Sequence, residues 1–344
     1  MNDPQVLRIA ILSFAHVNSA AYARLLAAWP GVEVITSDPG SSPANEGPLR
    51  GREMADELGV QYVDDYDEVF AWNPHAVIIT AENSKHRELV ERAAIEGAHV
   101  LCEKPLATTA IDAEAMVEAC RSGGVSLMTA YPTRFSPSVT ALREILADGS
   151  LGTLVAATGT NNGKLPMGRA WYTDPALSGG GALVDQVDHV ADLIDHLTGL
   201  HPERVYAAVN VILHSGRAAG TVETAGFVTI TYQGGVIATI DCSWSQPDSA
   251  PIWGGLTFDI VGTGGQAAIE PFSQHLSGHS ETDRNGLYIP YGVDTNREMI
   301  AEFINAIRER RQPHPDGAAG LRSLSIVLAA QESAQTGLPI DVLG

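Results

Sequence analysis

Apolar runs and helical segments alternate regularly through the first 130 residues of the chain. Apolar runs that suit strands cover 7–12, 32–35, 76–80, 99–102 and 126–129, and helical patterns cover 19–29, 85–97 and 112–121. The first run is almost wholly apolar, as expected for a strand that is buried on both faces of a parallel sheet. This alternation predicts a doubly wound parallel sheet, in which ligands bind beyond the carboxyl ends of the strands.

The turn after the first strand is the first candidate ligand site. It contains Ser13, Phe14, Ala15, His16 and Val17. A dinucleotide-binding fold normally has G-x-G-x-x-G here, because glycine permits a tight turn and lets a pyrophosphate approach the backbone N–H groups. Ser13 and Ala15 stand in place of the first two glycines, and a side chain is tolerated there if φ stays negative. An ordinary turn without a ligand remains the alternative.

Two further strand ends carry charged candidates. Asp38 follows the second strand and would accept hydrogen bonds from an adenosine ribose while repelling a 2′-phosphate, which favours NAD over NADP. Arg50 and Arg52 lie downstream and would reverse that preference if they fold back. Lys104 follows the strand 99–102, and its ammonium suits a substrate hydroxyl that becomes an alkoxide. The alternatives are an ordinary turn aspartate and a solvated lysine.

Strand patterns follow one another beyond residue 150. They cover 154–160, 204–213, 224–232, 236–245, 256–262 and 266–270. Strands that are not interleaved with helices predict an antiparallel sheet, and Gly234-Gly235 indicates a hairpin turn. The strand 204–213 places Tyr206, Ala208 and Ile212 on its second face, where a water-facing strand would carry more Lys and Glu. We therefore expect another subunit on that face, in a homo-oligomeric dimer or tetramer. A merely neutral surface is the alternative.

One glycine-rich stretch opens a helix with a candidate acid–base pair. Gly179, Gly180 and Gly181 permit a sharp turn and a close approach by another chain segment or a ligand. Asp185 and His189 follow, four residues apart, so both side chains leave the same side of the helix. A carboxylate beside an imidazole suits general acid–base chemistry. A local ion pair on a solvated surface is the alternative.

The composition restricts the partners and the compartment. Of 344 residues, 41 are Asp or Glu and 21 are Lys or Arg, so the formal net charge is −20. This charge repels nucleic acids and anionic membranes, so neither is expected as a partner. Three widely spaced cysteines allow no disulfide framework and no paired metal ligands, and the first apolar run is too short to span a bilayer. We expect a cytoplasmic protein without a metal, folded as two domains that cover 1–130 and 131–344.

Several motifs, in this order along the chain, resemble those of the glucose–fructose oxidoreductase/inositol dehydrogenase (Gfo/Idh/MocA) family. They are Thr80-Ala81-Glu82-Asn83-Ser84-Lys85-His86, Glu103-Lys104-Pro105, Tyr131-Pro132-Thr133-Arg134-Phe135-Ser136-Pro137, Leu151-Gly152, Trp171 with Asp174-Pro175, and the glycine run with Asp185 and His189. The resemblance spans nearly the whole chain. It implies an α/β Rossmann domain followed by an α+β domain with an open, mostly antiparallel sheet. Ser13 and Ala15 depart from its glycine fingerprint, and Glu82 replaces a usual proline.

The resemblance also implies roles for individual residues. Lys104 would contact the substrate hydroxyl and the nicotinamide, His189 would be the general base, and Asp185 would orient it or bind substrate. Four further residues would line the cofactor cleft: Ala81, Asn83, His86 and Glu103. Arg134 would be catalytic or would anchor the domain junction, and we favour the anchor.

The predicted function is hydride transfer between a hydroxyl of a sugar or cyclic polyol and NAD, with NADP possible. The candidate substrate-binding residues outside the catalytic trio are Asn161, Lys164, Trp171 and Tyr172. Their amide, ammonium and aromatic groups suit a polyhydroxylated ligand, although Trp and Tyr are often core or interface residues. One alternative is a redox-neutral enzyme that cleaves a glycosidic bond with tightly bound NAD. A second is a ligand-sensing protein on the same scaffold.

Overall fold

The computed structural model describes residues 6–40, 49–166, 168–214, 222–272, 275–280 and 285–342. The chain divides into two compact units, each described by itself. Unit 1 contains Met1–Ala130, Met167–Trp171 and Asn296–Leu321, and unit 2 contains Tyr131–Pro166, Tyr172–Thr295 and Arg322–Gly344. Two segments from the second half of the sequence, 167–171 and 296–321, therefore belong to unit 1.

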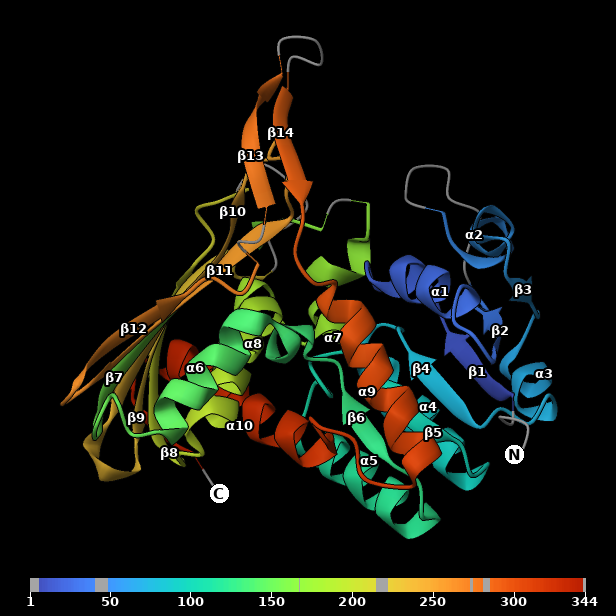
Figure 1. The fold of residues 1–344 in the computed structure, drawn as a ribbon, viewed down its shortest axis with the longest axis horizontal. Helices are drawn as coiled ribbons and strands as arrows, with labels where there is room; N and C mark the ends of the chain where they lie inside the picture. Colours follow the sequence, from blue (N-terminus) through green and yellow to red (C-terminus); the bar gives the residue numbers. More distant parts are fainter. Residues whose placement is uncertain are drawn as a thin grey trace. The chain divides into compact units, whose positions relative to one another are not determined.

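A six-stranded parallel sheet forms the centre of unit 1 (Figure 1). Its strands are β1 (Leu7–Leu12), β2 (Val32–Ser37), β3 (Gln61–Tyr62), β4 (Ala76–Ile79), β5 (His99–Cys102) and β6 (Leu127–Thr129). They lie in the order β3-β2-β1-β4-β5-β6, and every neighbouring pair is parallel. Ile9, Ile11 and Val77 are fully buried, because helices cover both faces of such a sheet. This is the strand order of dinucleotide-binding folds, so the predicted Rossmann architecture is confirmed.

The helices of unit 1 connect these strands or pack against them. They are α1 (Ser19–Ala27), α2 (Gly51–Leu58), α3 (Tyr66–Ala71), the 3-10 helix η1 (Asn83–Lys85), α4 (His86–Ile95), α5 (Ala110–Gly123) and α9 (Thr295–Glu309). Side-chain caps begin two of them: Asp65 accepts from the Glu68 N–H at 2.8 Å, and Thr109 accepts from the Asp112 N–H at 3.1 Å. The helix predicted for 85–97 is α4 (His86–Ile95), and the 3-10 helix η1 directly precedes it.

A seven-stranded mixed sheet forms the centre of unit 2. Its strands are β7 (Leu154–Lys164), β8 (Pro202–Asn210), β9 (Ala225–Tyr232), β10 (Ile237–Gln246), β11 (Gly254–Gly262), β12 (Gly265–Ile269) and β15 (Ile340–Asp341). They lie in the order β12-β11-β7-β10-β9-β8-β15, and only the β7–β10 pair is parallel. The mostly antiparallel sheet is therefore confirmed. A separate pair, β13 (His275–Ser280) and β14 (Asn285–Pro290), was not predicted.

Two boundaries in this sheet differ from the prediction. The strand β7 continues to Lys164, so residues 161–164 lie within it and do not leave it. The strand β8 ends at Asn210, so Ile212 lies beyond it. The predicted hairpin between β9 and β10 is present, and Gly234 and Gly235 have φ of 83° and 82°, which glycine adopts without a steric penalty.

Helices cover one face of this sheet. Unit 2 contains η2 (Pro132–Phe135), α6 (Pro137–Ala147), α7 (Pro175–Ser178) and α8 (Ala182–Thr198), whereas η3 (Ala170–Thr173) and α10 (Gly317–Thr336) are divided between the units. Leu183, Val187, Val190 and Ile194 of α8 form an apolar stripe that is buried in the core of unit 2. The helix α8 lies against β7 and β10.

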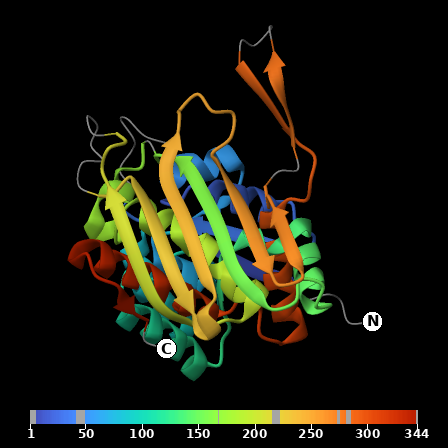
Figure 2. The ribbon, with the colours of Figure 1, turned by 90° about the vertical axis from the view of Figure 1, so that its left-hand side faces the viewer.

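No helix in the described part of the chain covers the other face of this sheet (Figure 2). Tyr206, Phe227, Ile237 and Val261 share this face and are 45, 50, 49 and 39% exposed. Threonines lie between them, and two pairs bond across the strands, Thr160 with Thr257 and Thr158 with Thr239. The predicted apolar second face therefore exists, and its coverage by another subunit stays a prediction.

Neither a membrane-spanning helix nor a cluster of metal-binding side chains is found among the described residues. None of the helices in these ranges is long and apolar enough to cross a membrane. No group of three or more His, Cys, Asp or Glu side chains in the same ranges is arranged to hold a metal ion.

Candidate functional site

The turn between β1 and α1 keeps a glycine-like backbone although it lacks the glycines. Ser13 has φ of 77°, in the left-handed region, so the condition of a negative φ is not met at this position. An L-residue adopts this region at a cost of about 1–2 kcal/mol. The Ser13 hydroxyl offsets this cost with local bonds: it donates to Asp38 Oδ1 at 2.8 Å and accepts from the Ala15 N–H at 3.1 Å. The side chain thus holds the turn that glycine would otherwise permit.

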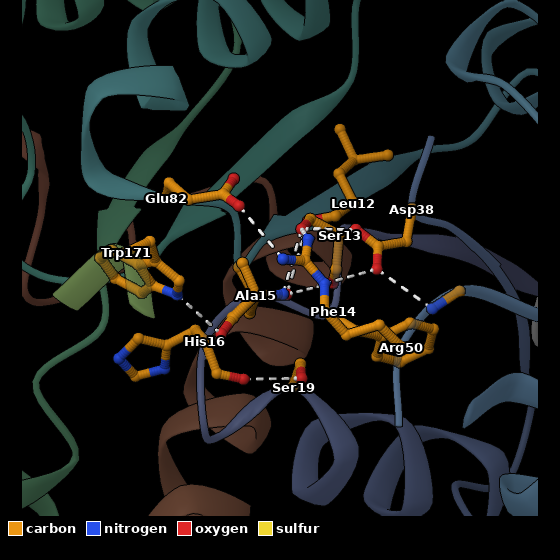
Figure 3. Close-up of polar contacts among 12 residues, drawn as sticks. Leu12, Ser13, Phe14, Ala15, His16, Ser19, Asp38, Arg50, Glu82 and Trp171 are labelled. Carbon is orange, nitrogen blue, oxygen red and sulfur yellow. Dashed lines mark hydrogen bonds and ion pairs between the residues drawn. The ribbon is translucent and has the colours of Figure 1, made fainter. Parts of the chain in front are cut away.

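Asp38 lies at the end of β2 beside this turn and is 1% exposed (Figure 3). Arg50 has folded back onto it: Nη2 lies 2.8 Å from Asp38 Oδ1, and Nε lies 3.0 Å from Oδ2. The Gly51 N–H at the start of α2 also donates to Oδ2, at 3.1 Å. Burial alone would raise the pKa of Asp38, but Arg50 and the hydrogen bond from Ser13 lower it. Asp38 is therefore ionised and fully hydrogen-bonded within the protein.

Glu82 extends this ion pair into a three-residue cluster. Its Oε1 lies 3.2 Å from Arg50 Nη1, and its side chain is 17% exposed (Figure 3). Burial alone would lower the pKa of Arg50, but the two carboxylates raise it. The cluster of Asp38, Arg50 and Glu82 therefore carries one net negative charge. Arg52, the other predicted arginine, does not reach Asp38, because its Nη2 bonds Asp64 at 2.7 Å.

A cavity of about 270 Å³ adjoins this cluster at the carboxyl ends of β1 and β2. Its lining includes Ser13, Asp38, Arg50, Tyr66, Glu82 and Lys85. Carboxylate oxygens beside an arginine suit a ligand with several hydroxyl groups, because both acceptors and donors are present. The location and the donor set fit the adenosine end of a dinucleotide.

Glu103 contacts both the region of the turn between β1 and α1 and the backbone of Lys104, the next residue. Its Oε1 lies 3.2 Å from His16 Nδ1 and accepts from the Tyr22 hydroxyl at 2.7 Å and from Asn18 Nδ2 at 3.1 Å. Its Oε2 accepts from the Lys104 N–H at 3.1 Å. Burial alone would raise the pKa of Glu103, but His16 and the Tyr22 hydroxyl lower it to about 2. The buried carboxylate therefore fixes the turn and the backbone of Lys104 together.

His86 and Asn83, both predicted to line the cofactor cleft, are buried. The His86 ring nitrogens contact carbonyl oxygens: Nε2 lies 3.2 Å from that of Ala81, and Nδ1 lies 3.2 and 3.1 Å from those of Pro105 and Leu106. Burial lowers the pKa of His86. The ring thus links the segment after β4 to the residues after Lys104, which is 7% exposed.

A short segment of unit 1 from the second half of the sequence, residues 168–171 (the arm), contacts the turn between β1 and α1. Arg169 Nη1 donates to the Phe14 carbonyl at 2.8 Å and to the Ala15 carbonyl. The Trp171 indole N–H donates to the same Ala15 carbonyl at 3.1 Å (Figure 3). Trp171 was predicted on the substrate side, and the structure places it beside the candidate phosphate turn. Arg169 was not predicted.

In unit 2, α8 presents its acid–base pair from an otherwise buried surface. Among residues 182–194, only Asp185 and His189 are partly exposed. Asp185 lies in the first turn, where the positive end of the helix dipole favours its ionised form. Its Oδ2 accepts from the Trp244 indole at 2.9 Å and from Gln186 Nε2 at 2.6 Å. The predicted placement of both side chains on one side of the helix is confirmed.

Glu223 holds the start of α8. Its Oε1 accepts from the N–H groups of Gly181 and Leu183 at 2.8 and 3.1 Å, and its carbonyl accepts from the Ala182 N–H at 2.9 Å. A Cβ on Gly181 would lie 2.0 Å from that carbonyl oxygen. The glycine run thus admits a close approach by another segment of the same chain.

Two residues that follow β6, Tyr131 and Arg134, contact α8 near His189. The ring of Tyr131 meets the His189 ring edge-on at 6.3 Å, and its hydroxyl donates to Asp188 at 2.8 Å. Arg134 bonds Asp192 through Nη2 at 2.6 Å and Nε at 2.8 Å. Arg134 therefore anchors η2 to α8 through Asp192.

The predicted substrate-side residues of unit 2 have protein partners. Asn161 is buried, and its Nδ2 donates to the Gln186 carbonyl at 3.0 Å. Lys164 Nζ donates to the Asp248 and Ala250 carbonyls at 3.1 and 2.6 Å. Tyr172 is 6% exposed. Their contact with substrate stays a prediction, as does the convergence of Lys104 in unit 1 with Asp185 and His189 in unit 2.

Comparison with known families assigns both parts of the chain. Residues 43–131 match the family described as "Oxidoreductase family, NAD-binding Rossmann fold". Residues 139–268 match the "GFO/IDH/MocA C-terminal domain".

Characterised relatives cover most of the chain. A 1,5-anhydro-D-fructose reductase of Ensifer adhaerens is 30% identical over 273 residues, which is 78% of this chain and 79% of that protein. A D-xylose 1-dehydrogenase (NADP(+)) of Haloferax volcanii is 28% identical over 308 residues, 87% of this chain and 90% of the relative. A 2,7-anhydro-N-acetylneuraminate hydratase of Escherichia coli is 28% identical over 216 residues, 61% and 58% of the two chains.

A solved structure has the same fold. The crystal structure of GenD2 from gentamicin A biosynthesis, in complex with NAD, superposes with a TM-score of 0.86 at 22% identity. The superposition covers 99% of this chain and 97% of that one.

Proposed function

Because the chain belongs to the GFO/IDH/MocA family of NAD-binding oxidoreductases, we propose that it transfers a hydride between a hydroxyl-bearing carbon of a sugar or cyclic polyol and the nicotinamide of NAD. The observation that carries this proposal is the pair Asp185 and His189, which alone among residues 182–194 of α8 are partly exposed. The sugar and anhydrosugar enzymes among the relatives support the substrate class.

The chain supplies the proton chemistry, and NAD, when bound, supplies the hydride acceptor. His189 accepts the proton of the substrate hydroxyl, and the nearby Asp185 carboxylate stabilises the resulting imidazolium. The ammonium of Lys104 donates a hydrogen bond to the substrate oxygen and stabilises the developing negative charge. Trp244 and Gln186 hold the Asp185 carboxylate, so it does not turn away when the charge develops.

The cluster around Asp38 favours NAD over NADP in this proposal. Asp38 and Glu82 outnumber Arg50, so the net charge near the expected adenosine ribose is negative and opposes a 2′-phosphate. A bound ribose hydroxyl would replace one of the groups that now donate a hydrogen bond to Asp38. The folded-back Arg50 alone does not reverse the preference, because Glu82 balances its charge.

The test is a screen of aldoses, inositols and anhydrosugars with NAD and with NADP, followed by absorbance of the reduced nicotinamide. On the best substrate, His189→Asn and Lys104→Met should each lower kcat by about 10²–10⁴-fold while NAD still binds. His201→Asn is the matched control, because His201 is exposed and lies outside the helix. Activity of H189N within a few-fold of the wild type would refute the assigned base.

A redox-neutral reaction is the second candidate, because one relative is a hydratase. Such an enzyme would oxidise a carbon only transiently and return the hydride after elimination or water addition. A dehydrogenase accumulates NADH with excess NAD and substrate, whereas the redox-neutral enzyme forms product without net NADH. Product analysis by NMR beside the absorbance trace separates the two.

We also propose that the open face of the unit 2 sheet joins two copies of this chain. Its exposed Tyr206, Phe227, Ile237 and Val261 form an apolar surface that a water-facing sheet would rarely keep. The threonine pairs between neighbouring strands suit sheet-to-sheet packing.

A further inference from the structure

The N–H groups of the turn between β1 and α1 are largely used within the protein. The Ala15 N–H donates to the Ser13 hydroxyl at 3.1 Å. Four other N–H groups of the turn also donate within the protein: Ser13 to the Ser37 carbonyl, His16 to the Thr80 carbonyl, Asn18 to His16 Nδ1, and Ser19 to the His16 carbonyl. In dinucleotide folds these amides help bind the pyrophosphate. Here five of the seven amides from Ser13 to Ser19 already donate within the protein, so a cationic side chain beside the turn would strengthen the binding of a diphosphate.

The sequence around the turn does not supply that charge. No Lys or Arg lies between Arg8 and Arg24, and the whole chain carries a net charge of −20. Glu103, buried next to the turn, adds negative charge at short range. Arg50, whose Nη2 lies 3.2 Å from Ser13 Oγ, is already paired with the carboxylates of Asp38 and Glu82. A cofactor diphosphate carries about two negative charges, so its approach to this turn would be opposed unless a cation lies close by.

Arg169 brings such a cation to the turn. Its Nη1 bonds the Phe14 and Ala15 carbonyls, and Trp171, two residues further on, bonds the Ala15 carbonyl as well. Residues 167–171 belong to unit 1, so this contact lies within one compact unit. A guanidinium is planar and its charge is delocalised over the whole fork, so anchoring one nitrogen fixes the whole charge beside the turn.

We infer that Arg169 is a further cofactor-binding residue, whose guanidinium binds the diphosphate of the dinucleotide. It supplies the positive charge that the turn amides with partners inside the protein do not supply. Trp171 is a positioning residue, because its indole fixes the arm on the Ala15 carbonyl without adding charge. This inference rests on the proposed use of NAD. It gives the arm, predicted from sequence on the substrate side, a role on the cofactor side.

The experiment compares ligands with and without the diphosphate. Dissociation constants of NAD and ADP-ribose are measured by calorimetry, and that of adenosine by NMR titration, on the wild type, Arg169→Gln, Arg169→Lys and Trp171→Phe. Loss of one charge-assisted contact should weaken NAD and ADP-ribose by about 10–100-fold in R169Q and leave adenosine within about twofold. R169K should recover part of the loss, and W171F should show a smaller loss.

Salt dependence gives a second readout that needs no variant to be active. The wild-type affinity for ADP-ribose should fall as ionic strength rises, and R169Q should show a flatter dependence. Equal weakening of adenosine and ADP-ribose in R169Q, or no weakening of either, would overturn the inference, as would a wild-type affinity that ignores salt. A wild type that binds neither NAD nor ADP-ribose would instead refute the proposed function.

Discussion

Asp38→Asn tests whether the acidic cluster selects the cofactor. Asp38 is 1% exposed, and Arg50 contacts both of its carboxylate oxygens, at 2.8 and 3.0 Å. Removing one partner of a fully buried ion pair costs about 3–5 kcal/mol. The Arg50 side chain is 24% exposed and keeps its contact with Glu82, so we expect a loss of about 2–3 kcal/mol in the free energy of unfolding.

The same substitution should change the cofactor preference. It removes one negative charge from a cluster whose net charge is −1, and a 2′-phosphate carries about two negative charges. At a separation of about 5 Å and with the screening of bulk water, loss of this charge lowers the repulsion of the 2′-phosphate by about 1.7 kcal/mol, which corresponds to about 15-fold in affinity. Weaker screening in the cavity makes the effect larger. The ratio of kcat/KM for NADP over that for NAD should therefore rise at least about tenfold in D38N.

The assay combines steady-state kinetics with both cofactors and chemical denaturation. Asp64→Asn is the matched control, because Asp64 pairs with Arg52 of α2 at an exposed position. This control should leave both the stability and the cofactor ratio unchanged. A cofactor ratio in D38N within about threefold of the wild type would refute the assignment of Asp38 to the adenosine ribose. An equal loss of stability in D64N would refute the argument from burial.

Three further predictions concern acid stability, the start of α8 and assembly. The folded-state pKa of Glu103 is about 2 and its ordinary value is 4.5, so the stability that its carboxylate contributes is present above pH 4.5 and is lost as the pH falls towards 2. Denaturation across this window should show a steep fall in the free energy of unfolding in the wild type and a flatter one in Glu103→Gln. Gly181→Ala would place a Cβ 2.0 Å from the Glu223 carbonyl oxygen and should cost about 1–3 kcal/mol by denaturation, whereas Gly255→Ala, with open space around its Cβ, should cost less. Phe227→Arg on the open sheet face should shift the molar mass measured by light scattering towards the monomer without lowering the melting temperature of unit 1; an unchanged mass would exclude this face as the interface.

The sheets were predictable because burial leaves a direct signal in the sequence. The strand β1 was predicted over its full range, since both of its faces are buried and its residues are almost all apolar. The strand predicted for 236–245 is β10, in which Ala238, Ile240 and Trp244 are fully buried. The pair β13 and β14 was missed, because it forms a small sheet of its own.

The candidate cofactor site was only partly predictable, because its contacts join distant residues. The sequence allowed Arg50 to fold back on Asp38, but only the structure adds Glu82 and Ser13 to that pair. The contact of Arg169 with Phe14 spans 155 residues. No local pattern indicates such a contact, and a lone arginine in a loop is ordinarily solvated.

The two departures from the family pattern lie in one network and act on the same group. Ser13 stands where a glycine is usual, and its hydroxyl contacts Asp38 Oδ1 and Arg50 Nη2. Glu82 stands where a proline is usual, and it contacts the other terminal nitrogen of Arg50. A glycine at the first position would remove a bond that orients Asp38, and a proline at the second would leave Arg50 with one carboxylate. The two replacements therefore support one arrangement, in which a folded-back arginine stays beside the predicted ribose-binding carboxylate without cancelling its charge.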